Sequence, residues 1–433
     1  MSNRWPVRRV VVALSVVAAL VSVGAFDAVF TGVAVAAKAP APFTQGPAGR
    51  AFYNPPGRLP AGAHGKLIWA RRIPAPKGAI AWKVLYKSKL VSGKMVPVSG
   101  LVIAPTGRPP KGGRKVVAWA HGTLGGARSC APSIPYNPAR NLSSYYTYND
   151  PDFIDVGVPA LTKFLAAGDV VTATDYQGLG APGVHQYTVG RTEANNVIDS
   201  VKAAAQLPGV DPGKRVVALG WSQGGGAAIF TGQQGEAAYA KPLKVVGIAA
   251  LAPAANNGPD LSGQVAMGPV DSTSPYVLAV QELNVIRGYA AAYPGLSVST
   301  MVTAAGMPAL NALNVECTIH LQDTLQELGV DPRTFFTGPF PAAWQARFNQ
   351  NTAGLETTDA PVLTMQGTTD TVVNPNGTTQ YIARACQFTQ PVEYSIYPGV
   401  NHQVIPFAAM NEYVSWIAAR FAGKPAPSNC ASP

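Results

Sequence analysis

The pentapeptide Gly220-Trp221-Ser222-Gln223-Gly224 constrains the fold of this chain more than any other feature. An apolar run at residues 215–219 precedes it, and a run of small residues at 225–230 follows it. This order predicts a strand, a tight turn and a helix, with the Ser222 hydroxyl held out at the end of a sheet. The glycines leave room for a strained turn and for close contact between strand and helix. A serine hydroxyl needs this placement, because it reacts only where a base and a substrate carbonyl can both reach it.

If Ser222 is a nucleophile, an acid and a histidine should follow it, each at the carboxyl end of a later strand. The apolar run 360–366 predicts one strand, and Asp370 lies in the loop after it. The run 392–397 predicts the next strand, and His402 follows its Pro-Gly turn. Of the five histidines, His402 alone lies after Asp370. We therefore expect a triad in which Asp370 orients His402, and His402 takes and returns the serine proton.

Each of these residues also has a structural interpretation. Ser222 could be a small turn residue, and Asp370 and His402 could cap a turn or a helix. Asp359 and Glu356 are alternative acids. Both precede the predicted strand, so they would lie at the opposite end of the sheet from Ser222.

Acyl transfer also requires backbone donors for the oxygen that becomes negative. The amide of Gln223, the residue after the predicted nucleophile, is one expected donor. The run 115–120 predicts an earlier strand that leads into a glycine-rich segment. Thr123 in that segment is the preferred second donor, with Gly122 and Leu124 as alternatives. A flexible surface turn is the other interpretation of this segment.

Short apolar runs alternate with amphipathic segments through much of the chain. Residues 79–86 and 96–103 predict an antiparallel pair of strands. Further strands are predicted at 169–174 and 245–251, and helices at 153–167, 193–207 and 404–421. This alternation predicts an α/β fold with a mostly parallel sheet that helices cover on both faces.

Between residues 253 and 356 the strand pattern gives way to helical periodicity. We interpret this segment as a helical cap inserted between the nucleophile and the acid, at residues 255–355. The predicted core then comprises residues 55–254 and 356–433. A cap over a serine site can form an apolar tunnel for an acyl chain and exclude water.

The N-terminus has the pattern of a secretory signal. Three arginines precede an apolar run at residues 10–26, which predicts a signal peptide over residues 1–36. Small residues allow cleavage after Ala36 or after Ala25, and an uncleaved anchor is the alternative. Residues 37–54 are predicted to be a linker. We therefore expect a protein that is secreted or associated with the cell envelope.

The cysteine content and the net charge indicate which disulfides, metal sites and binding partners this chain can have. The four cysteines favour two disulfides in an exported chain, and the sequence alone allows three pairings. No spacing of cysteine or histidine fits a metal site. The net charge of +11 could favour contact with anionic lipid or the cell envelope. The basic residues are scattered without a recognition motif, so nucleic acid is not an expected partner.

Three further segments accompany the Ser222 turn: His121-Gly122-Thr123, residues 129–133 and residues 174–180. Together these motifs resemble the secretory lipase family, the lipase-A type of fungi and its actinobacterial relatives. The similarity extends from about residue 55 to 421. It implies an α/β-hydrolase core with a helical lid, and a triad of Ser222, Asp370 and His402.

The resemblance also implies the disulfide pairing, Cys130 with Cys317 and Cys386 with Cys430. The chain departs from the family at one point. Fungal members carry an acidic residue in the oxyanion loop, whereas here no Asp or Glu lies between residues 121 and 130. Main-chain donors must then suffice in this loop.

These features predict a monomeric serine hydrolase that cleaves lipid-type carboxylic esters through an acyl-enzyme, without a cofactor. An acyltransferase would use the same triad and differ in how well water is excluded from the acyl-enzyme. A pseudo-hydrolase that only binds lipid is the alternative outside enzymes.

Overall fold

The computed structural model describes residues 43–135, 157–235, 238–257, 275–358 and 360–430. The predicted signal peptide with both cleavage sites lies outside these ranges, as do Asp359 and residues 258–274 of the predicted cap.

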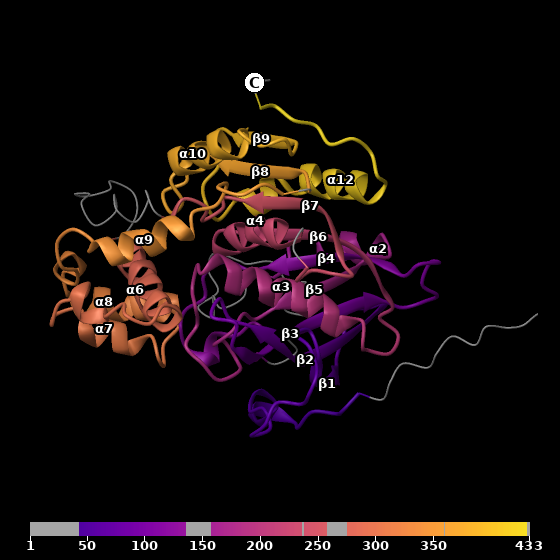
Figure 1. The fold of residues 1–433 in the computed structure, drawn as a ribbon, viewed down its shortest axis with the longest axis horizontal. Coiled ribbons are helices and arrows are strands. Elements are labelled where there is room, and N and C mark those ends of the chain that lie inside the picture. The colour runs from indigo at the N-terminus through magenta and orange to yellow at the C-terminus, as the bar shows by residue number, and fades with distance from the viewer. Residues whose placement is uncertain (1–42, 136–156, 236–237, 258–274, 359, 431–433) are drawn as a thin grey trace, which may run out of the picture. The chain divides into compact units, whose positions relative to one another are not determined.

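One sheet of nine strands forms the centre of the fold, in the order β1-β2-β3-β5-β4-β6-β7-β8-β9 (Figure 1). The pairs β1–β2, β2–β3 and β3–β5 are antiparallel, and all later pairs are parallel. The strands are β1 (Leu67–Ile73), β2 (Ala79–Lys89), β3 (Met95–Pro105), β4 (Arg114–Ala120), β5 (Val170–Thr174), β6 (Pro212–Trp221), β7 (Lys244–Leu251), β8 (Val362–Gly367) and β9 (Val392–Tyr397). The mostly parallel sheet confirms the predicted α/β-hydrolase fold class.

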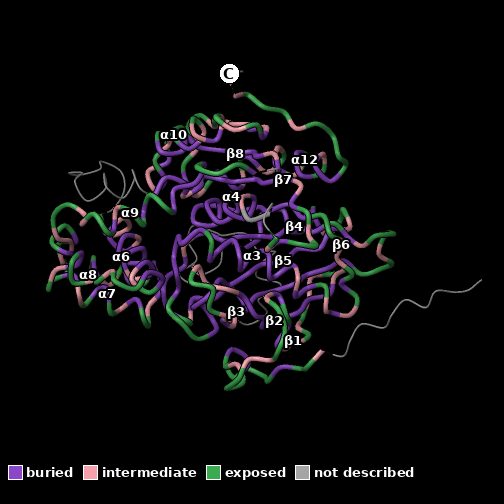
Figure 2. Tube along the Cα trace, viewed as in Figure 1, coloured by how far each residue is buried: buried purple, intermediate pink, exposed green. Residues whose placement is uncertain are grey.

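Helices cover both faces of this sheet, as expected for parallel strands that are apolar on both sides. One face packs against α2 (Leu161–Ala166), α11 (Ile405–Ala408) and α12 (Met410–Phe421). The other packs against α3 (Gly190–Ala204), α4 (Gln223–Gly235) and α10 (Pro375–Ala385). Figure 2 shows buried chain through the central strands and exposed chain mainly at the periphery.

A helical insertion separates β7 from β8 in the sequence. Its helices in the described part are α6 (Pro275–Ala292), α7 (Met307–Ala312), α8 (Thr318–Glu327) and α9 (Ala342–Gln350), and no strand of the sheet lies among them. They share a hydrophobic cluster with Tyr187 and Val189, and it includes Leu283, Ile286, Phe335 and Trp344. This helical segment lies where the cap was predicted, and the cap's function remains a prediction.

Some elements differ from the sequence prediction. The helix predicted at 153–167 begins in the structure at Leu161, and the start of the predicted range lies outside the described residues. Pro159 disfavours helix in the residue before it, and Ala160 has a left-handed φ of 62°. Strand β1 and helix α10 were not predicted. Residues 43–54, within the predicted linker, pack on the sheet, because Phe52 and Tyr53 are buried and Gly46 N donates to Ala70 O.

Among the described residues, no helix is both long enough and apolar enough to cross a membrane. Short 3-10 helices lie at Gly49–Tyr53, Arg128–Cys130, Val298–Thr300 and Pro332–Thr334.

Candidate active site

The turn around Ser222 joins β6 to α4 with a strained backbone. Ser222 has a left-handed φ of 59°, which a non-glycine residue rarely adopts. A Cβ on Gly220 would overlap the Gly224 carbonyl oxygen, and a Cβ on Gly224 would overlap that of Ala120 at the end of β4. Glycine is therefore needed at both positions for the helix to start this close to two strands.

The structure brings the three predicted triad side chains together at the carboxyl ends of β6, β8 and β9. His402 Nε2 lies 2.9 Å from Ser222 Oγ, and His402 Nδ1 lies 2.7 Å from Asp370 Oδ2. All three residues are buried, between 3% and 6% exposed. At these distances His402 can exchange a proton with the Ser222 hydroxyl while it stays hydrogen-bonded to the carboxylate.

Local hydrogen bonds fix both Asp370 and His402. Asp370 Oδ1 accepts from the amides of Val372 and Val373, at 2.9 and 2.8 Å, and Oδ2 accepts from Gln366 Nε2 at 2.9 Å. A carboxylate that accepts these bonds needs a donor at His402 Nδ1, so the proton lies there and the Nε2 lone pair faces Ser222. This is the tautomer that a general base requires.

The loop after β4 lies directly against Ser222. A Cβ on Gly122 would be 3.4 Å from Ser222 Cβ and 2.6 Å from the Trp221 ring. In the described part of the chain, neither the Thr123 amide nor the Gln223 amide donates to a backbone carbonyl. These amides are the two predicted oxyanion donors.

Three other polar residues, Glu356, His121 and Asp175, are hydrogen-bonded to groups other than Ser222. Glu356 is exposed and pairs with Arg191 at 2.9 Å. His121 is buried, its Nδ1 lies 2.6 Å from the Gly122 carbonyl oxygen, and burial lowers its pKa to about 4. A buried, neutral His121 therefore packs within this loop. Asp175 is buried too, and it accepts from Ser99 Oγ at 2.6 Å.

Both disulfides implied by the family resemblance are present, Cys130–Cys317 and Cys386–Cys430. The first joins the segment after the predicted oxyanion loop to the start of α8. The Thr318 amide reinforces this connection by donating to Leu124 O at 2.9 Å. The second attaches the C-terminal segment to the end of α10.

Sequence reasoning missed the residues that surround Gln223. Gln223 Nε2 donates to Glu193 Oε1 at 2.6 Å and lies 3.0 Å from His185 Nε2. Tyr187 Oη lies 2.5 Å from Thr123 Oγ1. The only available signal was the position of Glu193 on a predicted helix.

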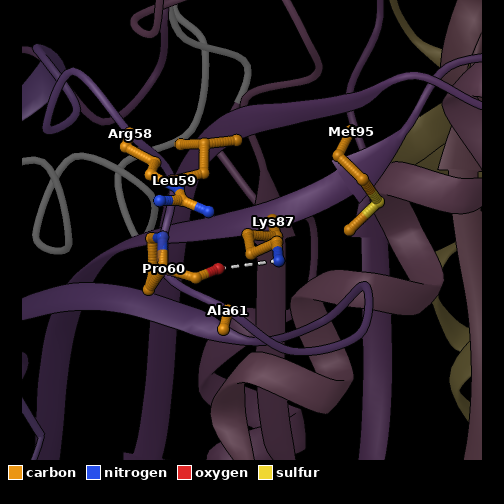
Figure 3. A pocket seen from close by; sticks show the side chains of 6 residues that line it. All are labelled: Arg58, Leu59, Pro60, Ala61, Lys87 and Met95. Atoms are coloured by element: carbon orange, nitrogen blue, oxygen red, sulfur yellow. Dashed lines mark hydrogen bonds between the residues drawn. The ribbon is translucent and has the colours of Figure 1, made fainter.

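A pocket of about 590 Å³ lies elsewhere, between the loop at residues 58–61 and the β2–β3 hairpin (Figure 3). Lys87, which lines this pocket, binds the protein's own backbone, because its Nζ donates to Pro60 O at 2.8 Å. Ser222 does not line this pocket. Within the described ranges, no group of three or more His, Cys, Asp or Glu side chains could hold a metal ion.

Comparison with known proteins places the site in a family context. Residues 154–429 match the sequence model described as secretory lipase. Lipase 6 of Candida albicans is 23% identical over 421 residues, which cover 88% of this chain and 82% of that protein. Lipase 10 of the same organism is 24% identical over 414 residues, covering 89% and 83%.

Two solved structures share the fold. Candida antarctica lipase A superimposes with a TM-score of 0.71 at 17% identity, covering 88% of this chain and 87% of that one. The rice cell wall degrading esterase LipA from Xanthomonas oryzae superimposes with a TM-score of 0.65 at 18% identity, covering 83% and 98%.

Proposed function

Because this chain belongs to the secretory lipase family, we propose that it is a secreted serine hydrolase that cleaves carboxylic esters of the lipid type. The observation that carries this proposal is the position of His402 between Ser222 Oγ and Asp370 Oδ2, at 2.9 and 2.7 Å. The three groups are then the catalytic residues.

In the first half-reaction, Ser222 Oγ attacks the ester carbonyl carbon, and His402 Nε2 takes the serine proton. The carbonyl oxygen becomes negative and accepts hydrogen bonds from the amides of Gln223 and Thr123. The C–O bond to the alcohol breaks as His402 returns the proton to the departing oxygen. Asp370 stabilises the imidazolium and keeps its orientation throughout.

In the second half-reaction, water attacks the acyl carbon and gives its proton to His402 Nε2. The bond between the acyl carbon and Ser222 Oγ breaks, and the serine regains its proton. The products are a carboxylic acid and a regenerated hydroxyl. No redox group or cofactor is needed for either step, since every proton moves between groups already in the site.

The two alternative functions differ from ester hydrolysis at different half-reactions, the acyltransferase at the second and the pseudo-hydrolase at the first. An acyltransferase would pass the acyl group to an alcohol in place of water, using the same residues. A lipid-binding pseudo-hydrolase would not form the acyl-enzyme. The tautomer of His402, whose free Nε2 lone pair faces Ser222, favours a reactive serine.

Further evidence bears on the cellular location and the binding partners of the protein. An apolar N-terminal run, two disulfides and family membership support export to the medium or the cell envelope. The net charge of +11 supports contact with anionic lipid. We also propose a monomer, and an actinobacterial type within the family.

The test compares the wild type with Ser222→Ala on p-nitrophenyl esters of increasing acyl length. We expect the variant to lose nearly all hydrolysis while its circular dichroism and melting temperature stay close to those of the wild type. A fluorophosphonate should label the wild type only. Equal hydrolysis by the two proteins would refute the proposal, and lipid binding with neither labelling nor ester turnover would favour the pseudo-hydrolase. An added alcohol that captures most of the acyl product would identify an acyltransferase.

A further inference from the structure

The side-chain amide nitrogen of Gln223 contacts two buried residues, Glu193 and His185. Its amide nitrogen donates to Glu193 Oε1 at 2.6 Å and lies 3.0 Å from His185 Nε2. His185 Nδ1 lies 2.9 Å from the Gln177 carbonyl oxygen and must donate to it, so Nε2 is left to accept. Burial lowers the pKa of His185 to about 3, which keeps the ring neutral. Both protons of the Gln223 amide are therefore used, and its side chain cannot swing.

Glu193 connects Gln223 to the segment that follows His185. The same oxygen that accepts from Gln223 also accepts from the Thr188 amide at 2.9 Å. Glu193 is 2% exposed, and burial raises its pKa to about 8. Near neutral pH the carboxyl group is thus largely protonated, and it can hold these two donors without an uncompensated buried charge.

The same segment also holds the second oxyanion residue. Tyr187 Oη lies 2.5 Å from Thr123 Oγ1, and Tyr187 is buried. Helix α6 of the insertion supports Tyr187 from behind, because a Cβ on Gly288 would lie 2.6 Å from the Tyr187 amide nitrogen. Residues 185–188 therefore contact both predicted donor residues. His185 contacts Gln223, and the Thr188 amide binds the same Glu193 oxygen as Gln223. Tyr187 contacts Thr123.

We propose that His185, Tyr187 and Glu193 are positioning residues for ester hydrolysis, which hold Gln223 and Thr123 so that both main-chain amides face the developing oxyanion. This inference rests on the proposed function. It accounts for an oxyanion loop without an acidic residue, because side-chain contacts orient the donors in its place. None of the three residues touches the reacting atoms, so their contribution is to preorganisation.

The test uses Glu193→Leu, Glu193→Gln and Tyr187→Phe. Tyr293→Phe serves as the matched control, since Tyr293 is similarly buried and its hydroxyl accepts from Asn351 Nδ2 at 2.8 Å. The readouts are kcat, KM, the melting temperature and the inhibition constant of an alkyl trifluoromethyl ketone. Serine adds reversibly to this ketone, and the adduct carries an anionic oxygen that resembles the oxyanion of the proposed reaction.

We expect Glu193→Leu and Tyr187→Phe to lower kcat by about 10- to 100-fold with KM within about twofold, less than the loss of a whole donor. The inhibition constant of the ketone should rise in proportion. Glu193→Gln keeps the acceptor oxygen without charge, so it should recover most of the activity. Tyr293→Phe should match the wild type in kcat.

The inference is overturned if Tyr187→Phe and Glu193→Leu match Tyr293→Phe in kcat and ketone affinity while Ser222→Ala is inactive. Should Glu193→Leu fail to fold, Tyr187→Phe decides alone, because it removes one oxygen atom and keeps the ring. If Ser222→Ala retains wild-type hydrolysis, the proposed function fails instead. The two failures are thus distinguishable.

Discussion

Glu282 in α6 gives a stability prediction whose size follows from its burial. The residue is 5% exposed, and its Oε1 has no hydrogen-bond partner among the described residues. Burial raises the pKa of Glu282 from 4.5 to about 8. The folded protein therefore prefers the neutral acid, while the unfolded chain ionises near pH 4.5. Stability contributed by this group is complete below pH 4.5 and is lost as the pH rises through about 8.

The substitution Glu282→Gln keeps the shape of the side chain and removes its titration. Each pH unit between the two pKa values changes the free energy of unfolding by about 1.4 kcal/mol. The advantage of the variant over the wild type should therefore grow by about 4 kcal/mol between pH 5 and pH 9. Other buried acids, such as Glu193, titrate equally in both proteins and cancel in the difference.

The assay is urea unfolding at pH 5, 7 and 9, followed by circular dichroism. Glu327→Gln is the matched control, because Glu327 is an exposed glutamate in α8 of the same insertion. Its difference from the wild type should stay nearly constant with pH. A Glu282→Gln curve that runs parallel to the wild type over the whole range would refute the reasoning, since Glu282 would then ionise in the folded state as easily as in water.

Three further outcomes are expected. Gly224→Ala should destabilise the protein by about 2 to 3 kcal/mol in thermal unfolding, because the new methyl group overlaps the end of β4. The control Gly338→Ala has open space around it and should change the free energy of unfolding by less than about 0.5 kcal/mol. Similar melting temperatures for the two variants would contradict this packing. Replacing Cys130 and Cys317 together by serine opens a loop of 187 residues and should lower the free energy of unfolding by about 5 kcal/mol; an unchanged urea midpoint would argue against it. Asp370→Asn should lower kcat by about 10³- to 10⁴-fold without loss of fold, because the wrong His402 tautomer then faces Ser222; kinetics within tenfold of the wild type would exclude that role for Asp370.

The sequence was most informative where chemistry follows the end of a strand. Ser222, Asp370 and His402 each come after a short apolar run that forms a parallel strand, and parallel strands end at the same edge of a sheet. Their order alone therefore predicted that they would meet. The fold class followed from the same alternation of strands and helices.

The supporting residues could not be found in this way. Helix α3 is buried on nearly every side, and its polar residues Glu193, Asn196 and Asp199 interrupt any apolar stripe. Their partners lie in loops or on other elements, where no periodicity operates. Strand β1 was not predicted from the sequence, because the adjacent residues Arg71 and Arg72 interrupt the alternation of apolar and polar residues. In each case a tertiary contact, and not a local pattern, decides the role of the residue.

The Cys130–Cys317 bond has a consequence for attempts to reduce this protein to a minimal hydrolase. Cys130 is completely buried, and its partner belongs to the helical insertion. Deleting the insertion would leave an orphan thiol next to Gly125 in the loop after β4, able to cross-link with Cys386 or Cys430 during oxidative refolding. A truncated enzyme therefore requires a compensating exchange at position 130, and the insertion cannot be treated as a detachable module.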